Sequence, residues 1–199
     1  GQMIEFINER LLALLGLLCE EGKEGVSCRS KNPSPLQLPR EFRNKAKETS
    51  DIIHVGIKKF INGINKLEEE GFIDFSPKNN VYRITDRGYW YYINHYLSRI
   101  NHLTKKNAIE FFDRAEEDYI KNRYGKAYAG LVNAIEELAK HHTIHRRSRY
   151  LSKLKSKEEG EIQNISKSEE ISEARFREIF RKHELKRNRA LTQSLLYLL

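Results

Sequence analysis

The sequence predicts a mainly α-helical protein, with one small β-hairpin in its N-terminal half and an α-helical bundle in its C-terminal half. Apolar residues recur at helical spacing through most of the chain. The spacing changes toward two only around residues 72–84, where turn-forming residues separate two short apolar segments. The length of 199 residues, of which 39% are hydrophobic, allows one domain or two small ones with a buried core.

Three helices are expected first. An apolar stripe predicts a helix over residues 3–20, and three of the four prolines follow in a segment that must be irregular. A short helix is expected over residues 40–47. Thr49 and Ser50 are expected N-caps of a longer third helix, which Gly71 ends.

The β-hairpin comes next. Residues 72–75 and 81–84 read as short strands, and the segment between them is rich in turn formers. Thr85 is expected to cap a helix that continues to about Leu103.

Two strings flank this hairpin, INKLEEEGFI over residues 64–73 and YRITDRG over residues 82–88. They resemble the end of the third helix and the exit from the wing in winged helix-turn-helix regulators of the MarR and PadR type. The resemblance covers a domain of residues 3–103. The long proline-containing segment departs from the family pattern and leaves room for an extra strand or a lineage-specific loop.

The resemblance implies double-stranded DNA as the partner, with the third helix in the major groove and the wing on the backbone or the minor groove. Lysine pairs well with guanine and asparagine with adenine, whereas lysine on phosphate adds affinity without sequence information. An alternative is a helix whose polar side is only solvated, in a module that contacts other proteins. The residues assigned to DNA are His54, Lys58, Lys59 and Asn62 of the third helix and Lys78, Asn79, Asn80 and Arg83 of the wing.

The net charge of +8 is concentrated in the second half. Residues 1–103 hold 15 Lys and Arg against 13 Asp and Glu, so only +2 of the excess lies there. No acid occurs between Glu137 and Glu158, where seven Lys and Arg residues stand. This run is expected either to neutralise phosphates or to form part of a flexible basic connector over residues 146–168.

Residues 104–199 are predicted to form a helical domain that pairs two copies of the chain. A helical hairpin is expected from about residue 107 to 145, with its turn at Tyr124 and Gly125, and a last helix from about Ser168 to the end. The string FDRAEEDYIKNRYGKAYAGLVNAIEELAK over residues 112–140 resembles the opening hairpin of HEPN domains, which are all-α, often dimeric and often ribonucleases.

That resemblance also implies an active-site arginine followed by a histidine four to six residues later. Thr192 stands where the histidine after Arg187 would be, and a hydroxyl cannot replace imidazole as a near-neutral acid or base. Arg177 and His183 fit the spacing only loosely. We therefore expect no enzyme activity, with metal-independent RNA cleavage as the alternative.

No cofactor or metal is expected. Cys19 and Cys28 match no metal spacing and are predicted to be reduced structural thiols. Glu137, His141 and His145 share one helical face, but no fourth ligand is visible. No apolar run is long enough to cross a bilayer and no secretion signal is evident, which predicts no membrane partner and a cytoplasmic location.

Taken together, these patterns predict a sequence-specific, dimeric DNA-binding protein that regulates transcription. A HEPN-type effector that binds or cleaves RNA is the first alternative. A winged-helix module that docks on another protein in a replication, partition or defence complex is the second.

Overall fold

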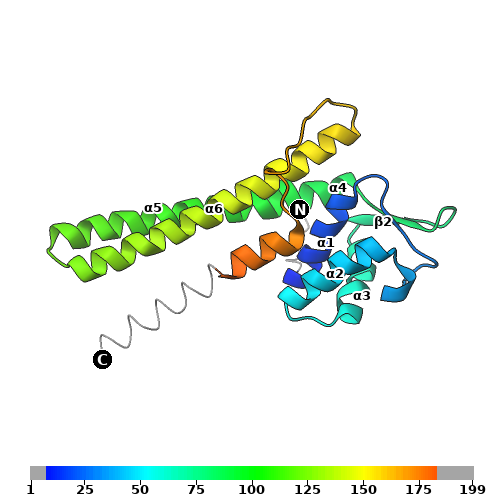
Figure 1. Cartoon of the computed structure of the whole chain (residues 1–199), viewed down its shortest axis with the longest axis horizontal. Coiled ribbons are helices and arrows are strands. Elements are labelled where there is room, and N and C mark those ends of the chain that lie inside the picture. Colours follow the sequence, from blue (N-terminus) through cyan, green and yellow to red (C-terminus); the bar gives the residue numbers. More distant parts are fainter. Residues whose placement is uncertain (1–7, 183–199) are drawn as a thin grey trace.

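The computed structural model describes residues 8–182, and within them the chain forms a mainly α-helical fold with one small sheet (Figure 1). The N-terminal part is winged-helix-like and the C-terminal part is helical. Residues 173–182 form a further helical segment. The elements are α1 (Glu9–Glu21), β1 (Val26–Ser27), η1 (Pro35–Gln37), α2 (Arg40–Ile52), α3 (Ile57–Glu69), β2 (Ile73–Ser76), β3 (Val81–Ile84), α4 (Asp86–Tyr89), η2 (Trp90–Leu97), α5 (Ser98–Ile120) and α6 (Tyr124–Glu158).

The antiparallel sheet has the order β1-β3-β2 within the described residues. Ile73 pairs with Ile84 across β2 and β3, which confirms the predicted hairpin. Val26 pairs with Tyr82, so the irregular segment after α1 does carry an extra strand, β1. The apolar faces of α1 and α3 pack against this sheet and against the aromatic residues that follow it.

The boundary between α2 and α3 differs from the prediction. Thr49 and Ser50 lie inside α2 and are buried, so they are not N-caps of the third helix. Their hydroxyls donate to the carbonyls of Lys45 (2.8 Å) and Lys47 (2.9 Å). Serine and threonine can satisfy a hydroxyl in this way within a helix, so residue type alone does not separate a cap from a helix interior. The break falls at residues 53–56 instead.

The helix after the wing is longer than expected. Thr85 caps it as predicted, because its Oγ1 accepts a hydrogen bond from the Gly88 N–H at 3.1 Å. Helical structure then continues without a break through α4, the π-helix η2 and α5 as far as Ile120. The predicted division at residues 103 and 104 therefore falls inside α5.

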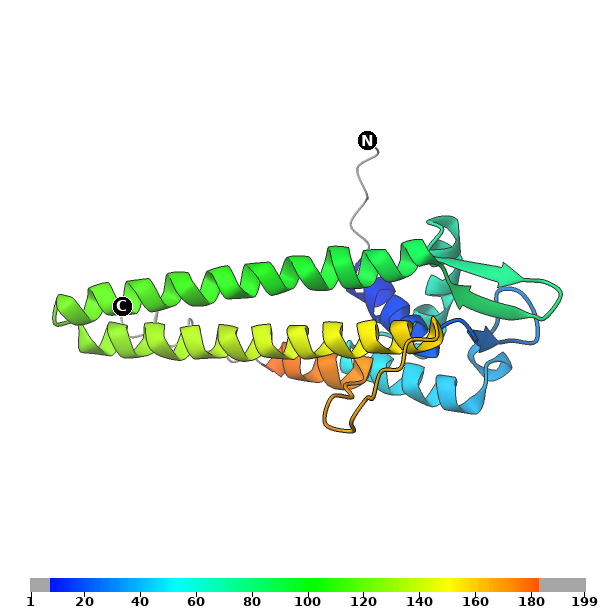
Figure 2. The same ribbon diagram turned by 90° about the horizontal axis from the view of Figure 1, so that it is seen from above.

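Helices α5 and α6 form a long antiparallel pair that projects from the winged-helix-like part (Figure 2). Their turn lies at residues 121–123, and Tyr124 and Gly125 already belong to α6. Residues 146–158, expected in a flexible connector, are the last turns of α6. The helix persists there because Arg147 and Leu151 are buried against the N-terminal part, a contact that local sequence does not reveal.

One apolar core contains residues from α1 through the last described helix. Ile144 and Leu151 of α6 belong to it, together with Ile171 and Phe176 of the segment that follows. The last helix begins at Glu173 rather than Ser168, and its expected continuation over residues 183–199 lies outside the described part of the chain.

Candidate nucleic-acid interface

Polar side chains gather at the N-terminal end of α3. Lys58, Lys59 and Asn62 are exposed, while Phe60 and Ile64 of the same helix are buried. This amphipathic spacing turns the apolar side of α3 to the core and leaves both lysines in solvent. The first turn of α3 holds no acidic residue, and its N-cap, Gly56, provides no side chain. The positive end of the helix dipole therefore adds to the lysine charges.

His54 lies in the turn before α3 and is not part of that helix, contrary to the prediction. It is exposed, with a φ of 57°, and its N–H donates to the carbonyl of Asp51 at 3.2 Å. His54 thus has a left-handed backbone conformation in the turn that separates α2 from α3. The Arg10 guanidinium donates to the carbonyl of Lys59 at 3.1 Å, which ties this end of α3 to α1.

The wing residues form a second group at the tip of the β2–β3 hairpin. Lys78, Asn79 and Asn80 are exposed in the turn, and Asn80 has a φ of 51°. The Asn80 carbonyl accepts hydrogen bonds from the Cys28 N–H (2.8 Å) and from Cys28 Sγ (3.3 Å), so the wing is fixed to the segment after β1.

Arg83 is placed differently from the wing tip. It lies in β3 opposite Asp74 and is only partly exposed. Its Nε is buried without a hydrogen-bond partner in the structure. The eight predicted residues thus fall into two exposed clusters, at the start of α3 and at the wing tip, with Arg83 behind the second.

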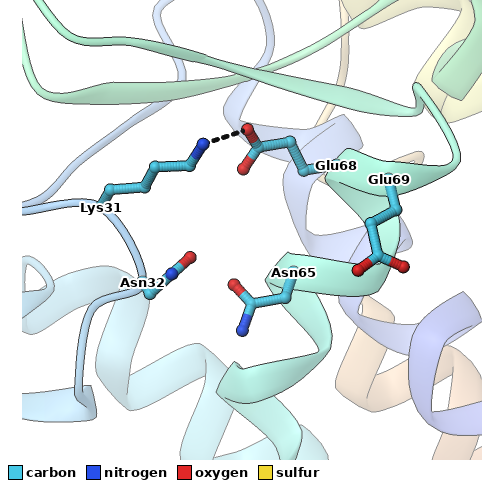
Figure 3. Close-up of a pocket in the computed structure, with 5 residues that line it drawn as sticks. All are labelled: Lys31, Asn32, Asn65, Glu68 and Glu69. Carbon is cyan, nitrogen blue, oxygen red and sulfur yellow. Dashed lines mark ion pairs between the residues drawn. The ribbon is translucent and has the colours of Figure 1, made fainter.

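The C-terminal end of α3 is acidic, as the glutamates of the sequence indicate, and it borders a pocket that was not predicted. An open pocket of about 440 Å³ lies here (Figure 3). Lys31 reaches across to Glu68 with an N–O distance of 2.9 Å, and this hydrogen bond raises the pKa of Lys31. Asn32 and Asn65 face one another in the same view. Lys31 and Glu68 are far apart in sequence, so no local signal pairs them.

This acidic end limits where a polyanion could lie. Lys66 pairs with Glu69 (3.7 Å) and Glu70 (3.1 Å), so the only lysine in the last turn of α3 is already neutralised within the helix. A phosphate is attracted to the start of α3 and repelled from its end.

At least four of the seven Lys and Arg residues in the basic run of α6 are buried or lie beside a carboxylate of the same chain. Lys140 and Arg147 are buried. Lys153 pairs with Glu169 at 2.5 Å, and Arg149 lies 3.8 Å from the same carboxylate. All four of these cations lie beside carboxylates of the same chain, an outcome that neither of the two interpretations left open for this run anticipated.

Arg177, the arginine of the loosely matching ribonuclease motif, is also inside the protein. Arg177 is buried, and its Nε donates to Glu173 at 2.8 Å while Nη1 donates to Tyr96 Oη at 3.0 Å. Such an arginine cannot contact a phosphate without breaking this pair. His183 and the Arg187 to Thr192 string lie outside the described residues.

The residues considered for a metal have other contacts. Glu137 is buried and pairs with Lys140 at 3.1 Å, and His141 Nδ1 lies 3.1 Å from the carbonyl of Asn101. Within residues 8–182, no three His, Cys, Asp or Glu side chains are arranged to hold a metal ion.

A comparison with known protein families, curated proteins and solved structures finds no match to this chain. None of the helices in the described part of the chain is long and apolar enough to cross a membrane.

Proposed function

We propose that the protein binds double-stranded DNA through the start of α3 and the tip of the wing, and that it regulates transcription. The observation that carries the proposal is the exposed Lys58, Lys59 and Asn62 group at the positive end of α3, on a winged-helix-like scaffold. A helix of 13 residues is about 20 Å long and fits the major groove.

The two clusters would contact different parts of the DNA. Lys58 and Lys59 supply charge for phosphates or guanine edges, and Asn62 has the donor and acceptor pair that matches adenine. Lys78 at the wing tip adds a backbone contact. Two copies of the chain would read an inverted repeat whose half-sites are about one helical turn apart.

Binding to labelled genomic fragments, measured by fluorescence anisotropy at several salt concentrations, tests the proposal. We expect Lys58→Ala/Lys59→Ala to weaken binding at least tenfold and to reduce the salt dependence by about two counterions. The matched control is Lys105→Ala/Lys106→Ala, an exposed lysine pair of α5, which should change neither quantity. Asn62→Ala should reduce discrimination between sequences more than affinity for random DNA.

Two outcomes would contradict the proposal. One is a wild type that binds no genomic fragment better than random DNA. The other is an unchanged affinity in the Lys58 and Lys59 variant.

The RNA-directed alternative is tested with the same preparation. It rests on the Arg187 string, and it requires cleavage of labelled RNA in EDTA that disappears in Arg187→Ala. Intact RNA after long incubation would exclude metal-independent cleavage.

A further inference from the structure

The projecting part of the α5–α6 pair is packed through its smallest residues. Ala108 and Ala115 of α5 and Ala127 and Ala134 of α6 are buried. A Cβ added at Gly130 would lie only 3.1 Å from the Cβ of Ala115. The two helices therefore approach closely at these positions, and a larger side chain at Gly130 has no room between them.

The large apolar residues of both helices lie outside this seam. We call them the hairpin stripe, and their exposed fractions run from 40% to 72%. A prediction from spacing alone would place them with the alanines on one buried face, whereas the structure separates the two sets. The hairpin stripe consists of Ile109, Phe112, Tyr119 and Ile120 of α5 and Tyr124, Tyr128, Leu131, Ile135 and Leu138 of α6.

The stripe residues of both helices lie on the same side of the pair. On α6, Ala134 is followed one and four residues later by Ile135 and Leu138. On α5, Ala108 is followed at the same offsets by Ile109 and Phe112, so both stripes are displaced from the seam in the same rotational sense. In an antiparallel pair, equal displacement turns both stripes to one face. The face is therefore continuous across the two helices.

This face has the size and period of a helix-bundle interface. On α6 its members alternate four and three residues apart, the spacing of knobs-into-holes packing. Nine large side chains at about half exposure present roughly 800 Å² of surface, which equals one partner's share of a standard interface. An apolar patch of that size exceeds what single proteins usually leave in water.

The chain's own last helix approaches α6 from the other side. Phe180 packs beneath the ammonium of Lys140, which lies 5.4 Å from the ring centroid, and Arg147 donates to the carbonyl of Ile171. Lys140 and Arg147 are displaced from the alanine seam in the sense opposite to the stripe. The described part of the chain therefore ends on the face that the stripe does not occupy.

We propose that the hairpin stripe is covered by the same stripe of a second copy of this chain, so that two hairpins form a four-helix bundle. Every copy carries the same apolar face, and a face of this kind can pair with itself across a twofold axis. The association is independent of whether α3 binds DNA, because no residue of α3 or of the wing takes part.

Sedimentation equilibrium of the full chain without DNA tests this proposal. Wild type should have twice the chain mass of 23.5 kDa. Leu131→Glu/Ile135→Glu should sediment as a monomer with unchanged helical circular dichroism. The control Leu103→Glu/Ile162→Glu places the same charges at two exposed apolar positions outside the stripe and should remain dimeric. Tyr128→Ser/Leu131→Ser probes the stripe without adding charge, in case the glutamates prevent folding.

A monomeric wild type at tens of micromolar, or a stripe variant that keeps the wild-type mass, would overturn the proposal. A monomer whose stripe tyrosines resist iodination would place residues 183–199 on the stripe, which overturns it as well. Loss of DNA binding with the dimer mass intact would count against the proposed function alone.

Discussion

The guanidinium of Arg147 lies 2.9 Å from the carboxylate of Glu173, and both side chains are fully buried. Arg147 also pairs with Glu20 of α1 and donates to the carbonyl of Gly16 at 3.2 Å. The hydroxyl of Tyr92 in η2 donates to Glu173. One buried network therefore joins α1, η2, α6 and the last helix, which lie far apart in sequence.

This network predicts a large effect of removing its central cation. Arg147→Met leaves Glu20 and Glu173 buried without their partner, and we expect a loss of about 3–5 kcal/mol in the free energy of unfolding. The control is Arg149→Met, because the Arg149 side chain is 62% exposed and 3.8 Å from Glu169. Urea titration measures both. Equal losses in the two variants would show that the buried pairs are not specifically required.

Close packing of α5 against α6 predicts a steric effect at Gly130. A Cβ there meets Ala115 Cβ at 3.1 Å, so Gly130→Val should push the helices apart and cost about 1–3 kcal/mol. Gly125→Val is the matched control, since a Cβ at Gly125 meets nothing within 4 Å. Thermal unfolding should separate the variants, and an unchanged Gly130→Val would argue against close contact of the helices.

A substitution at His54, which has a left-handed backbone conformation, distinguishes backbone strain at this position from a contact of its imidazole with DNA. His54→Gly should stabilise the fold by up to about 1 kcal/mol, because glycine has no Cβ to clash at positive φ. The same change should weaken DNA binding if the imidazole contacts DNA. Asn122→Gly, at a φ of 59° in the α5–α6 turn, should give a similar gain in stability without altering affinity. Unchanged binding in His54→Gly would remove His54 from the interface.

Burial predicts slow reaction of both thiols. Desolvation raises the pKa of Cys19 and of Cys28, so little thiolate forms near pH 8. We expect Ellman's reagent to label neither residue quickly in the folded protein and both in guanidinium chloride, with Cys28 the faster of the two in the native state. Rapid labelling of a full equivalent under native conditions would contradict the burial of these residues.

The contact of Glu169 with α6 predicts a pH dependence. The hydrogen bond from Lys153 lowers the pKa of the Glu169 carboxyl below its ordinary value of 4.5, and the Ser166 N–H contributes in the same direction. Because folding lowers this pKa, the ionised Glu169 carboxylate stabilises the contact fully above pH 4.5. That stabilisation is lost as the pH falls through the lowered pKa.

Hydrogen exchange of the Ser166 amide measures the effect. After correction for intrinsic rates, protection should decrease in acid for wild type, whereas Glu169→Gln should show the lower protection already at neutral pH. Equal protection in the two proteins at neutral pH would exclude this contact as the cause.

Elements with local signals follow the prediction closely. The cap at Thr85, the stop at Gly71 and the turn between β2 and β3 each depend on residues within a few positions of one another. The exposure of Lys58, Lys59 and Asn62 also follows from helical period alone. His54 could not be placed in this way, because the end of α2 depends on the burial of Thr49 and Ser50.

The fold class, the order of the helices and the β2–β3 hairpin, and the polar side of α3 could be predicted, because they depend on the period of apolar residues and on caps and turns. Which charges are buried and which apolar residues are exposed depends on contacts between distant segments. Arg147 looked like one more cation in a basic run until Glu20 and Glu173 were brought to it from the two ends of the chain. In the same way, contact between the alanines of α5 and α6 left the larger residues outside, since two helices that touch through small side chains cannot also enclose large ones.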